Sequence, residues 1–197
     1  MTAQPHSVRL ALPSEAAGIA AVQRRAWTQL YAEPVAAQLL DSTDLAAMTQ
    51  AWEAAIRRPP LATLRVLVAV DSSQGSHRVV GFAAVGPSDD PDANPAEDGL
   101  VAEFAIDPLA QRLGHGSRLL QACADTLRAD GFIRASWWVR ASDDPLRAFL
   151  TGAGWAPDGA HTELGSEDDA SGIKFVRLHT DISAARITPA EPGSPAR

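Results

Sequence analysis

The stretch that decides the fold is Phe104-Ala-Ile-Asp-Pro-Leu-Ala-Gln-Arg-Leu-Gly-His-Gly-Ser-Arg-Leu-Leu120. Its apolar beginning predicts a strand that ends at Ile106, and Pro108 then breaks strand pairing. A short loop leads from there to Gly114 and Gly116 at the start of a helix. A helix N-terminus exposes backbone N–H groups and the positive end of the helix dipole, and glycines let a ligand approach the backbone closely. The stretch therefore predicts an anion-binding site suited to phosphates.

Two common phosphate-binding motifs do not fit this stretch. A Walker A loop needs Gly-Lys-Ser or Gly-Lys-Thr, which is absent here. A dinucleotide-binding fingerprint needs a third glycine at position 119, where the chain has Leu119, and it usually sits near the first strand of a fold. A Gly-x-Gly pair alone is also typical of an ordinary turn at a helix start. The longer spacing around the pair therefore has to decide what binds there.

Hydrophobic periodicity predicts the elements on either side of this stretch. Expected strands cover residues 8–12, 64–70, 79–85, 100–106, 133–139, 156–164 and 173–180, and expected helices cover residues 15–30, 33–58 with a break near 41–43, 114–129 and 145–153. Residues 86–99 are rich in proline and acidic side chains, which predicts a mobile surface loop. The order β-α-α-β-β-β-α-β-α-β-β mixes hairpins with one strand-helix-strand unit, which favours a mixed sheet with helices on both faces.

Size and charge limit the classes of function. The chain has 197 residues, of which 46% are hydrophobic, and this suits one domain with a sizeable core. Its net charge is −7, from 24 acidic and 17 basic side chains. A protein that binds a nucleic-acid duplex needs a basic face to replace the counterions of phosphate, so we expect no nucleic-acid partner. An acidic body attracts cationic molecules such as amines, weakly and in a salt-dependent way.

Cysteine usage and the termini indicate the compartment. Cys123 is the single cysteine, which excludes an internal disulfide, and no Cys/His cluster has the spacing of a zinc site. Because Cys123 lies on the apolar stripe of its helix, we expect a buried, inert thiol, and we expect no metal site. Residues 1–6 lack the pattern of a signal peptide, and no apolar run approaches the roughly 20 residues of a membrane span. These observations predict a cytoplasmic protein without a membrane partner.

The spacing Pro108-x-x-Gln111-x-x-Gly114-x-Gly116, followed by two leucines, resembles the acetyl-CoA motif of the GNAT superfamily of acyl-CoA-dependent N-acyltransferases. Residues 139–155, which end in Gly-Trp, are similar to the family's fifth strand and fourth helix, which normally finish in Gly-Phe. The resemblance covers residues 8–180. It implies an α/β (α+β) fold with a mixed, mostly antiparallel sheet of about seven strands, splayed between strands four and five, with helices on both faces. We expect this domain at residues 1–182 and a disordered tail at 183–197.

The resemblance also implies how acetyl-CoA binds, as a co-substrate without a metal. Backbone groups of Phe104 and Ile106 would pair with the pantetheine arm and the thioester, and N–H groups of residues 112–117 would cradle the pyrophosphate. Ser117 would add its hydroxyl, and Arg112 would add charge near the 3′-phosphate unless it lies on a solvated helix face. The donor-binding residues implied in this way are Phe104, Ala105, Ile106, Gln111, Arg112, Leu113, Gly114, His115, Gly116, Ser117 and Asp143.

Three positions depart from patterns found in the family. The helical tyrosine that many members use to protonate the leaving thiolate is Leu150 here, and the asparagine seven residues earlier is Asp143. The strand-five glutamate of the ribosomal-protein N-terminal acetyltransferases is replaced by Trp138. Another group or water would then protonate the thiolate, or the activity would be weak.

Glu103 is the preferred candidate for the catalytic base, since it precedes Phe104 on the strand beside the expected thioester. The alternative is that its face of the strand is open to solvent and the carboxylate has no role in the reaction. Trp137 and Trp138 point to opposite faces of their strand, so at least one belongs to the core and the other is a candidate wall of the acceptor site. Tyr31 either lines that site or packs against the second helix, and His115 is expected to be an exposed loop residue without a catalytic role.

We therefore expect an N-acyltransferase that moves an acetyl group from acetyl-CoA to the primary amine of a small molecule by direct attack on the thioester. Two alternatives remain open at the level of the sequence. One is a protein or peptide N-acetyltransferase, and the other is a non-catalytic CoA-binding regulatory module. Since dimers are frequent in the family, a homodimer also remains open.

Overall fold

The structure is a computed structural model that describes residues 6–30, 35–73, 77–164 and 172–183. Its strands are β1 (His6–Leu10), β2 (Arg65–Asp71), β3 (Arg78–Pro87), β4 (Asp98–Ile106), β5 (Arg134–Arg140), β6 (Ala156–Leu164) and β7 (Ile173–Asp181). Its helices are η1 (Pro13–Glu15), α1 (Ala16–Leu30), α2 (Val35–Ser42), α3 (Leu45–Arg57), η2 (Pro108–Ala110), α4 (His115–Ala129) and α5 (Asp144–Gly152). The predicted order of elements is confirmed in the described ranges, with α2 and α3 as the two parts of the broken second helix.

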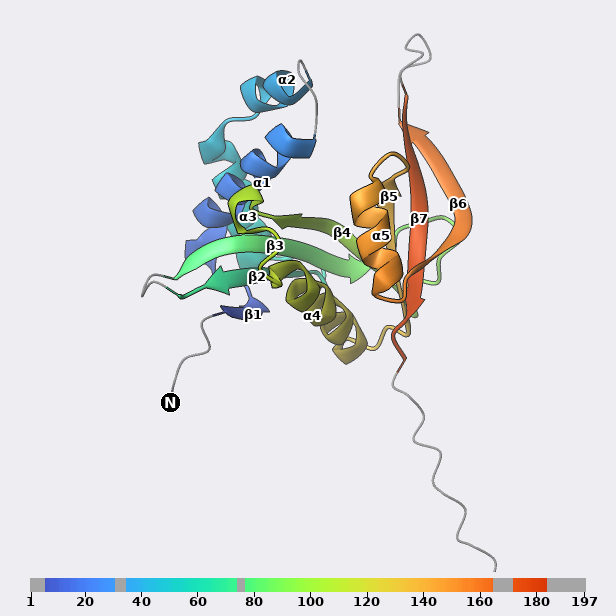
Figure 1. Cartoon of the computed structure of the whole chain (residues 1–197). Coiled ribbons are helices and arrows are strands. Elements are labelled where there is room, and N and C mark those ends of the chain that lie inside the picture. Colours follow the sequence, from blue (N-terminus) through green and yellow to red (C-terminus); the bar gives the residue numbers. More distant parts are fainter. Residues whose placement is uncertain (1–5, 31–34, 74–76, 165–171, 184–197) are drawn as a thin grey trace, which may run out of the picture.

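The strands form one seven-stranded sheet in the order β1-β2-β3-β4-β5-β7-β6 (Figure 1). Every neighbouring pair is antiparallel except β4 and β5, which are parallel. The sheet is thus mixed and mostly antiparallel, as the sequence predicted. β7 lies between β5 and β6 because the last hairpin folds back onto β5 with its second strand.

The sheet is splayed in the middle. β4 and β5 are in register over only three pairs, Asp98↔Arg134, Gly99↔Ala135 and Leu100↔Ser136. Beyond these pairs β4 continues beside β3 as far as Ile106, and β5 continues beside β7 as far as Arg140. The two strands therefore diverge after the register ends, which leaves a gap between the halves of the sheet (Figure 1). We call the paired end of β4 and β5 the closed end.

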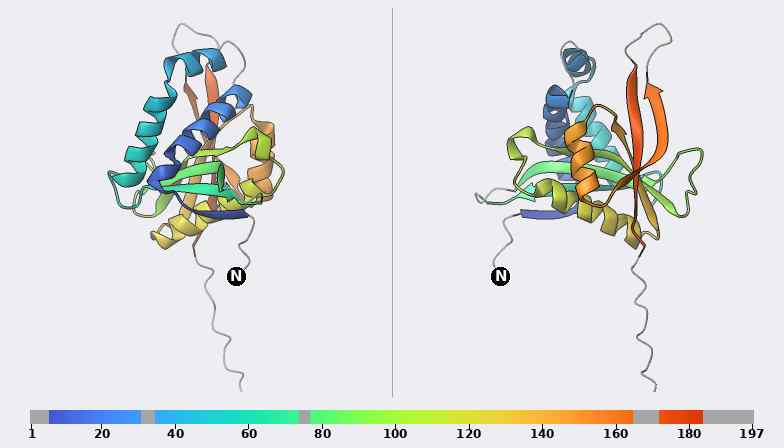
Figure 2. Two further views of the ribbon diagram at one scale, coloured as in Figure 1. Left: turned by 90° about the vertical axis from the view of Figure 1, so that its left-hand side faces the viewer. Right: turned by 45° about the vertical axis from the view of Figure 1, so that its right-hand side comes forward.

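Helices cover both faces of the sheet (Figure 2). On one face, here called the α4 face, α4 and α5 pack over a core that includes Leu119, Leu127 and Trp137. On the opposite face, here called the α1 face, α1 and α3 pack over a second core that includes Ile19 and Phe82. Both cores are built by helix stripes at a spacing of three to four residues set against alternate strand residues.

A β-bulge in β4 turns one side chain from the α4 face to the α1 face. The register Ala84↔Glu103 and Val85↔Val101 leaves Ala102 as an extra residue in β4. Val101 belongs to the core of the α4 face. In a regular strand, the side chain two residues later, that of Glu103, would point to the same face. Because of the extra residue, Glu103 points to the α1 face, and Phe104 packs against the core of the α4 face.

The segment between β3 and β4 lies where the sequence predicted a mobile surface loop. The two strands include the ends of the predicted loop, and the remaining residues are 88–97. Asp90 and Asp92 in this segment form ion pairs with Arg177 of β7. Most residues of the segment are exposed, as a surface loop requires, and its acidic side chains have a cationic partner that is remote in the sequence. The predicted tail lies outside the described residues except for Ser183.

Candidate donor and acceptor sites at the splayed strands

The edge of β4 that faces the gap presents backbone groups of Phe104 and Ile106. The N–H of Asp107 donates to the carbonyl of Val80 in β3 at 2.8 Å. In an antiparallel pair, alternate residues direct their N–H and C=O groups to the same neighbouring strand. Ala105 and Asp107 therefore pair with β3, and the backbone groups of Phe104 and Ile106 point towards the gap. This edge can pair with an extended ligand as an added strand would.

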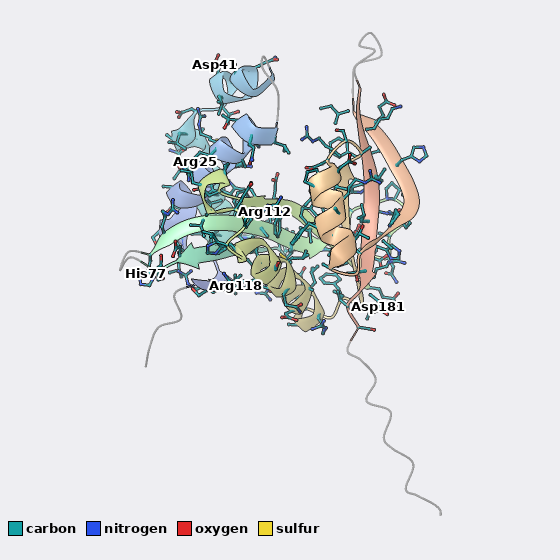
Figure 3. All side chains as sticks on the ribbon, in the orientation of Figure 1. Arg25, Asp41, His77, Arg112, Arg118 and Asp181 are labelled. Carbon is teal, nitrogen blue, oxygen red and sulfur yellow. The ribbon has the colours of Figure 1, made fainter. Side chains whose placement is uncertain are left out.

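The gap leads to the start of α4. Gly114 is the N-cap of α4 with a left-handed backbone (φ +78°), and Arg112 is also left-handed (φ +63°). The first N–H groups of a helix have no partner within the helix, so those of residues 115–117 are donors for a bound anion. Arg118 donates from Nη2 to the carbonyl of Leu113 at 3.1 Å, which holds the loop against the helix. Arg112 and Arg118 come from the two sides of this helix start (Figure 3).

The end of β4, the first turn of α4 and helix α5 meet at Gly116. A Cβ on Gly116 would lie 3.7 Å from Cζ of Phe149 and 3.8 Å from Cγ1 of Ile106. Leu150, next to Phe149, is completely buried in the core of the α4 face. Asp143 caps α5, because its carboxylate accepts the N–H of Leu146 at 3.1 Å. Asp143 thus has a structural role in this region of the protein.

Glu103 lies beside the gap on the α1 face. Its side chain reaches solvent, yet the surrounding protein displaces enough water from the carboxyl to raise its pKa. Desolvation disfavours the charged form of a carboxyl group. A raised pKa brings a carboxylate closer to the range in which it accepts a proton near neutral pH. Glu103 therefore has the place and the acidity of a candidate base.

Asp107 and Gln111 connect the strand end and the loop to α1. Asp107 is fully buried, and its carboxylate accepts from Arg25 at 2.8 Å and from the N–H of Leu109 at 3.1 Å. Burial alone would raise the pKa of Asp107, but these hydrogen bonds outweigh it and the pKa is lowered. The side chain of Gln111 donates to Gln29 at 2.8 Å. These contacts fix the position of the loop relative to α1.

Trp138 lies on the other side of the gap, on β5. Its neighbour Trp137 points to the α4 face, where its ring is 4.9 Å from that of Phe104. Trp138 therefore points to the α1 face, and its Nε1 donates to the carboxylate of Asp90 at 2.8 and 3.1 Å. The guanidinium of Arg177 lies over the indole at 5.5 Å from the ring centroid. The prediction that the two tryptophans point to opposite faces and that at least one belongs to the core is confirmed, since Trp137 is buried in the core.

A cavity of about 280 Å³ lies beside this cluster at the closed end. Its lining is polar and includes Asp98, Arg134, Ser136, Arg177 and His179. The charged groups pair with each other or with neighbouring residues, as in the two hydrogen bonds of Arg134 to Asp98 at 2.6 and 2.8 Å. We therefore regard the cavity as part of the closed end of the sheet.

The structure brings most of the predicted donor-binding residues to one place. Phe104, Ala105 and Ile106 form the end of β4, and residues 111–117 form the loop and the first turn of α4. The prediction that His115 is exposed is wrong, because its side chain is 1% exposed at the first helical position, where it packs inward. Tyr31 lies outside the described residues.

The contacts of Asp90 and Arg177 with Trp138 could not be predicted from the sequence. Arg177 is 87 residues from Asp90, and nothing in the spacing of charges indicates which acidic residue it meets.

Cys123 is buried, as predicted, and desolvation raises the pKa of its thiol to about 12. Within the described ranges, no group of three or more His, Cys, Asp or Glu side chains could hold a metal ion. No helix in the same ranges is long and apolar enough to cross a membrane.

Comparisons with known proteins agree with this geometry. A sequence model of the acetyltransferase (GNAT) family matches residues 24–155. An N-acetyltransferase from Staphylococcus aureus Mu50 is similar in structure with a TM-score of 0.68 and 16% identity, over 91% of this chain and 100% of that one. YncA from Salmonella typhimurium, described as an acetyltransferase and solved with its cofactor acetyl-CoA, has a TM-score of 0.68 and 16% identity over 95% and 99% of the two chains.

A third similar structure is the ribosomal-protein-S18-alanine N-acetyltransferase from Escherichia coli, with a TM-score of 0.59 and 15% identity over 93% and 97% of the two chains. At these identities the solved structures support the fold alone. None of the curated proteins compared with the chain matches it significantly.

Proposed function

The chain belongs to the acetyltransferase (GNAT) family, and from this premise we propose that it transfers an acetyl group from acetyl-CoA to the primary amine of a small molecule. The observation that carries the proposal is the gap between β4 and β5, whose free strand edge leads directly to the glycine loop at the start of α4. An extended pantetheine arm fits such an edge, and a pyrophosphate fits such a helix start.

In the proposed complex, Phe104 and Ile106 pair with the pantetheine arm through their backbone groups. The N–H groups of residues 112–117 hold the pyrophosphate, with the hydroxyl of Ser117 and the charge of Arg112 beside them. The acetyl carbonyl then lies next to the gap-facing N–H groups of β4, which stabilise the negative charge that develops on its oxygen.

The reaction itself is a direct attack of the neutral amine nitrogen on the thioester carbon. Glu103 removes a proton from the ammonium group, a bond forms between nitrogen and carbon, and the bond between carbon and sulfur breaks. Leu150 stands where many family members have a tyrosine, and its buried aliphatic side chain has no proton to give. We assign protonation of the leaving thiolate to water, which takes up in turn the second proton that the nitrogen loses as the amide forms.

The absence of an acidic side chain at Leu150 favours a second candidate function. If the missing acid abolishes turnover, the chain is a CoA-binding module without catalytic activity. The donor site is then retained for a regulatory role, and acetyl-CoA binds without the release of a thiol.

Thiol release distinguishes the two candidates. Purified protein is mixed with acetyl-CoA and with one of two ring-bearing amines, benzylamine or N,N-dimethylbenzylamine, which carry similar charge. We expect free CoA thiol, and a benzylamine product whose mass is increased by one acetyl group, because only the primary amine can form a stable amide. Equal thiol release with both amines, or none with any primary amine, would exclude the proposed reaction.

A further inference from the structure

Glu103 and Trp138 flank the gap from opposite strands. Phe104 and Trp137 touch across the gap on the α4 face, with 4.9 Å between their ring centroids. Glu103 and Trp138 are the strand neighbours of this pair, and side chains alternate along a strand. Both therefore point to the α1 face, one on each side of the gap, next to the place of the proposed thioester.

The indole of Trp138 is held in one orientation. Its Nε1 donates to both carboxylate oxygens of Asp90, at 2.8 and 3.1 Å, and one ring face is covered by the guanidinium of Arg177. Arg177 is itself fixed by carboxylates from two segments, Asp90 and Asp92 of the β3–β4 connection and Asp158 of β6. With a side chain that is only 12% exposed, Arg177 forms a rigid support for the aromatic ring.

This arrangement carries an excess of negative charge. Three carboxylates surround the single guanidinium of Arg177, and hydrogen bonds from Arg177 lower the pKa of Asp92 to about 2. Glu103 adds a further acidic side chain on the same face. A cationic molecule is attracted to such a surface, and an aromatic ring offers a flat apolar area and a favourable face for an ammonium group.

We propose that Trp138 is the wall of the acceptor site opposite Glu103, that Asp90 and Arg177 are the positioning residues that hold it, and that the site takes a cationic primary amine with an apolar or aromatic body. The apolar body of the acceptor packs on the indole, and its ammonium group faces Glu103. This inference rests on the proposed function, because it assigns the acceptor side of the same reaction.

The test compares two amines that differ in the apolar body, 2-phenylethylamine and ethylamine. We expect the unmodified protein to have a higher kcat/KM for 2-phenylethylamine. In Trp138→Ala this preference falls by about tenfold, which corresponds to the loss of one aromatic contact, while KM for acetyl-CoA stays within about twofold. Trp138→Phe retains most of the preference because a ring remains.

Variants of Asp90 test whether this residue positions the indole of Trp138. Asp90→Ala releases the indole and is expected to raise the KM for 2-phenylethylamine with little change in kcat. Asp90→Asn keeps an oxygen that accepts from Nε1 and is expected to restore the KM. Trp52→Phe is the matched control, because Trp52 is a half-buried tryptophan on α3 whose indole donates to Gln23 of α1 and packs on Phe82. Neither of these contacts involves Trp138, Asp90 or Arg177. It should leave the ratio between the two amines unchanged.

The outcomes separate this inference from the proposed function. One outcome is that the protein binds acetyl-CoA and acetylates amines, but Trp138→Ala has the same ratio of kcat/KM for 2-phenylethylamine to kcat/KM for ethylamine as the unmodified protein. In that case Trp138 is not a wall of the acceptor site, and the proposed function stands. Failure to acetylate 2-phenylethylamine despite acetyl-CoA binding also overturns the inference. If acetyl-CoA does not bind at all, the proposed function fails and the inference falls with it.

Discussion

At the scale of single residues, the donor site depends on a backbone conformation that only glycine adopts without cost. Gly114 has φ +78°, and a Cβ there would lie 3.3 Å from Nη1 of Arg118, the residue that holds the loop. A side chain therefore introduces backbone strain and disturbs the contact that orders the loop. A substitution of Gly114 is therefore the most direct way to test the role of the loop.

Gly114→Ala is expected to reduce the free energy of unfolding by about 1–2 kcal/mol, because L-residues are strained in the left-handed region. It should also weaken acetyl-CoA binding, measured by calorimetric titration. Gly131→Ala is the matched control, since Gly131 has φ +100° at the other end of α4 and an added Cβ would meet no atom within 4 Å. It should lower stability in a similar way with an unchanged Kd. Equal effects of both variants on the Kd would rule out a specific role of the loop.

Glu103→Gln tests the proposed base. We expect kcat to fall by roughly 10²–10⁴-fold, the usual contribution of a general base, with acetyl-CoA binding unchanged. The rate of the unmodified protein should fall as the pH drops through the pKa of Glu103, which lies above the ordinary glutamate value because of desolvation. The variant should lose this acidic limb. Glu97→Gln, at an exposed position outside the gap, should keep both the rate and the limb.

The same pKa shift has a consequence for stability. Because the pKa of Glu103 is higher in the folded state than in the unfolded chain, ionisation of its carboxyl destabilises the fold as the pH rises. Glu103→Gln should therefore raise the melting temperature at neutral pH.

A second outcome concerns the rate. If Glu103→Gln loses activity but its rate keeps the same pH dependence as that of the unmodified protein, Glu103 is not the base.

The face on which a side chain lies, and whether it is buried, could be predicted where a local pattern sets them. Alternation along a strand correctly placed Trp137 and Trp138 on opposite faces, and the helical stripe correctly buried Cys123. Contacts between segments could not be predicted, because periodicity gives the face of a residue and not its partner. His115 shows this limit, since a residue between two glycines turned out to be packed inward by the first turn of α4.

At the scale of elements, the closed end of the splay determines where β4 and β5 part. Asp98 is 4% exposed and accepts from Arg134 through both carboxylate oxygens, and it also accepts the N–H of Asn94 at 2.8 Å. Burial alone would raise the pKa of Asp98, but these hydrogen bonds outweigh it and the pKa is lowered. The ion pair therefore stabilises the closed end at neutral pH.

Asp98→Asn is expected to lower the free energy of unfolding by roughly 1.5–3 kcal/mol at pH 7, the usual range for a hydrogen bond to a charged group, as followed by urea denaturation. The stability from this ion pair is fully present above the unfolded-chain pKa of about 3.9. It is lost as the pH falls through the lower folded-state value. The difference between the two proteins should thus disappear in strong acid. Asp144→Asn, at an ion pair whose carboxylate is 86% exposed, should change stability by less than about 0.5 kcal/mol.

Strand and helix boundaries were predictable to within a few residues, because each element has a clear period and ends at proline, glycine or polar residues. The bulge at Ala102 was not predictable, although it turns Glu103 to the α1 face. An alanine in a run of apolar residues carries no signal that it is the extra residue in a strand pair. The binding of the β3–β4 connection by Arg177 was missed for a related reason, since its acidic composition is equally typical of an unattached loop.

At the scale of the whole molecule, the splayed sheet was predicted by the family resemblance and not by the periodicity. Hydrophobic patterns predicted the strands, but only the resemblance predicted a sheet splayed between the fourth and fifth strands. The structure confirms that splay, and the family match confirms the membership. The position of β7 between β5 and β6 depends on long-range pairing that no local pattern encodes.

The gap and the glycine loop together form the proposed binding site for acetyl-CoA. The most direct measurement is the melting temperature of the full chain as acetyl-CoA is added. A ligand that binds only the folded state stabilises it by about 2.7 kcal/mol at a hundredfold excess over its Kd. We predict a saturable rise in melting temperature, abolished or shifted to higher concentrations in Gly114→Ala and retained in Gly131→Ala. An unchanged melting temperature at millimolar acetyl-CoA would contradict the account, since the glycine loop would then be only a turn at the start of a helix.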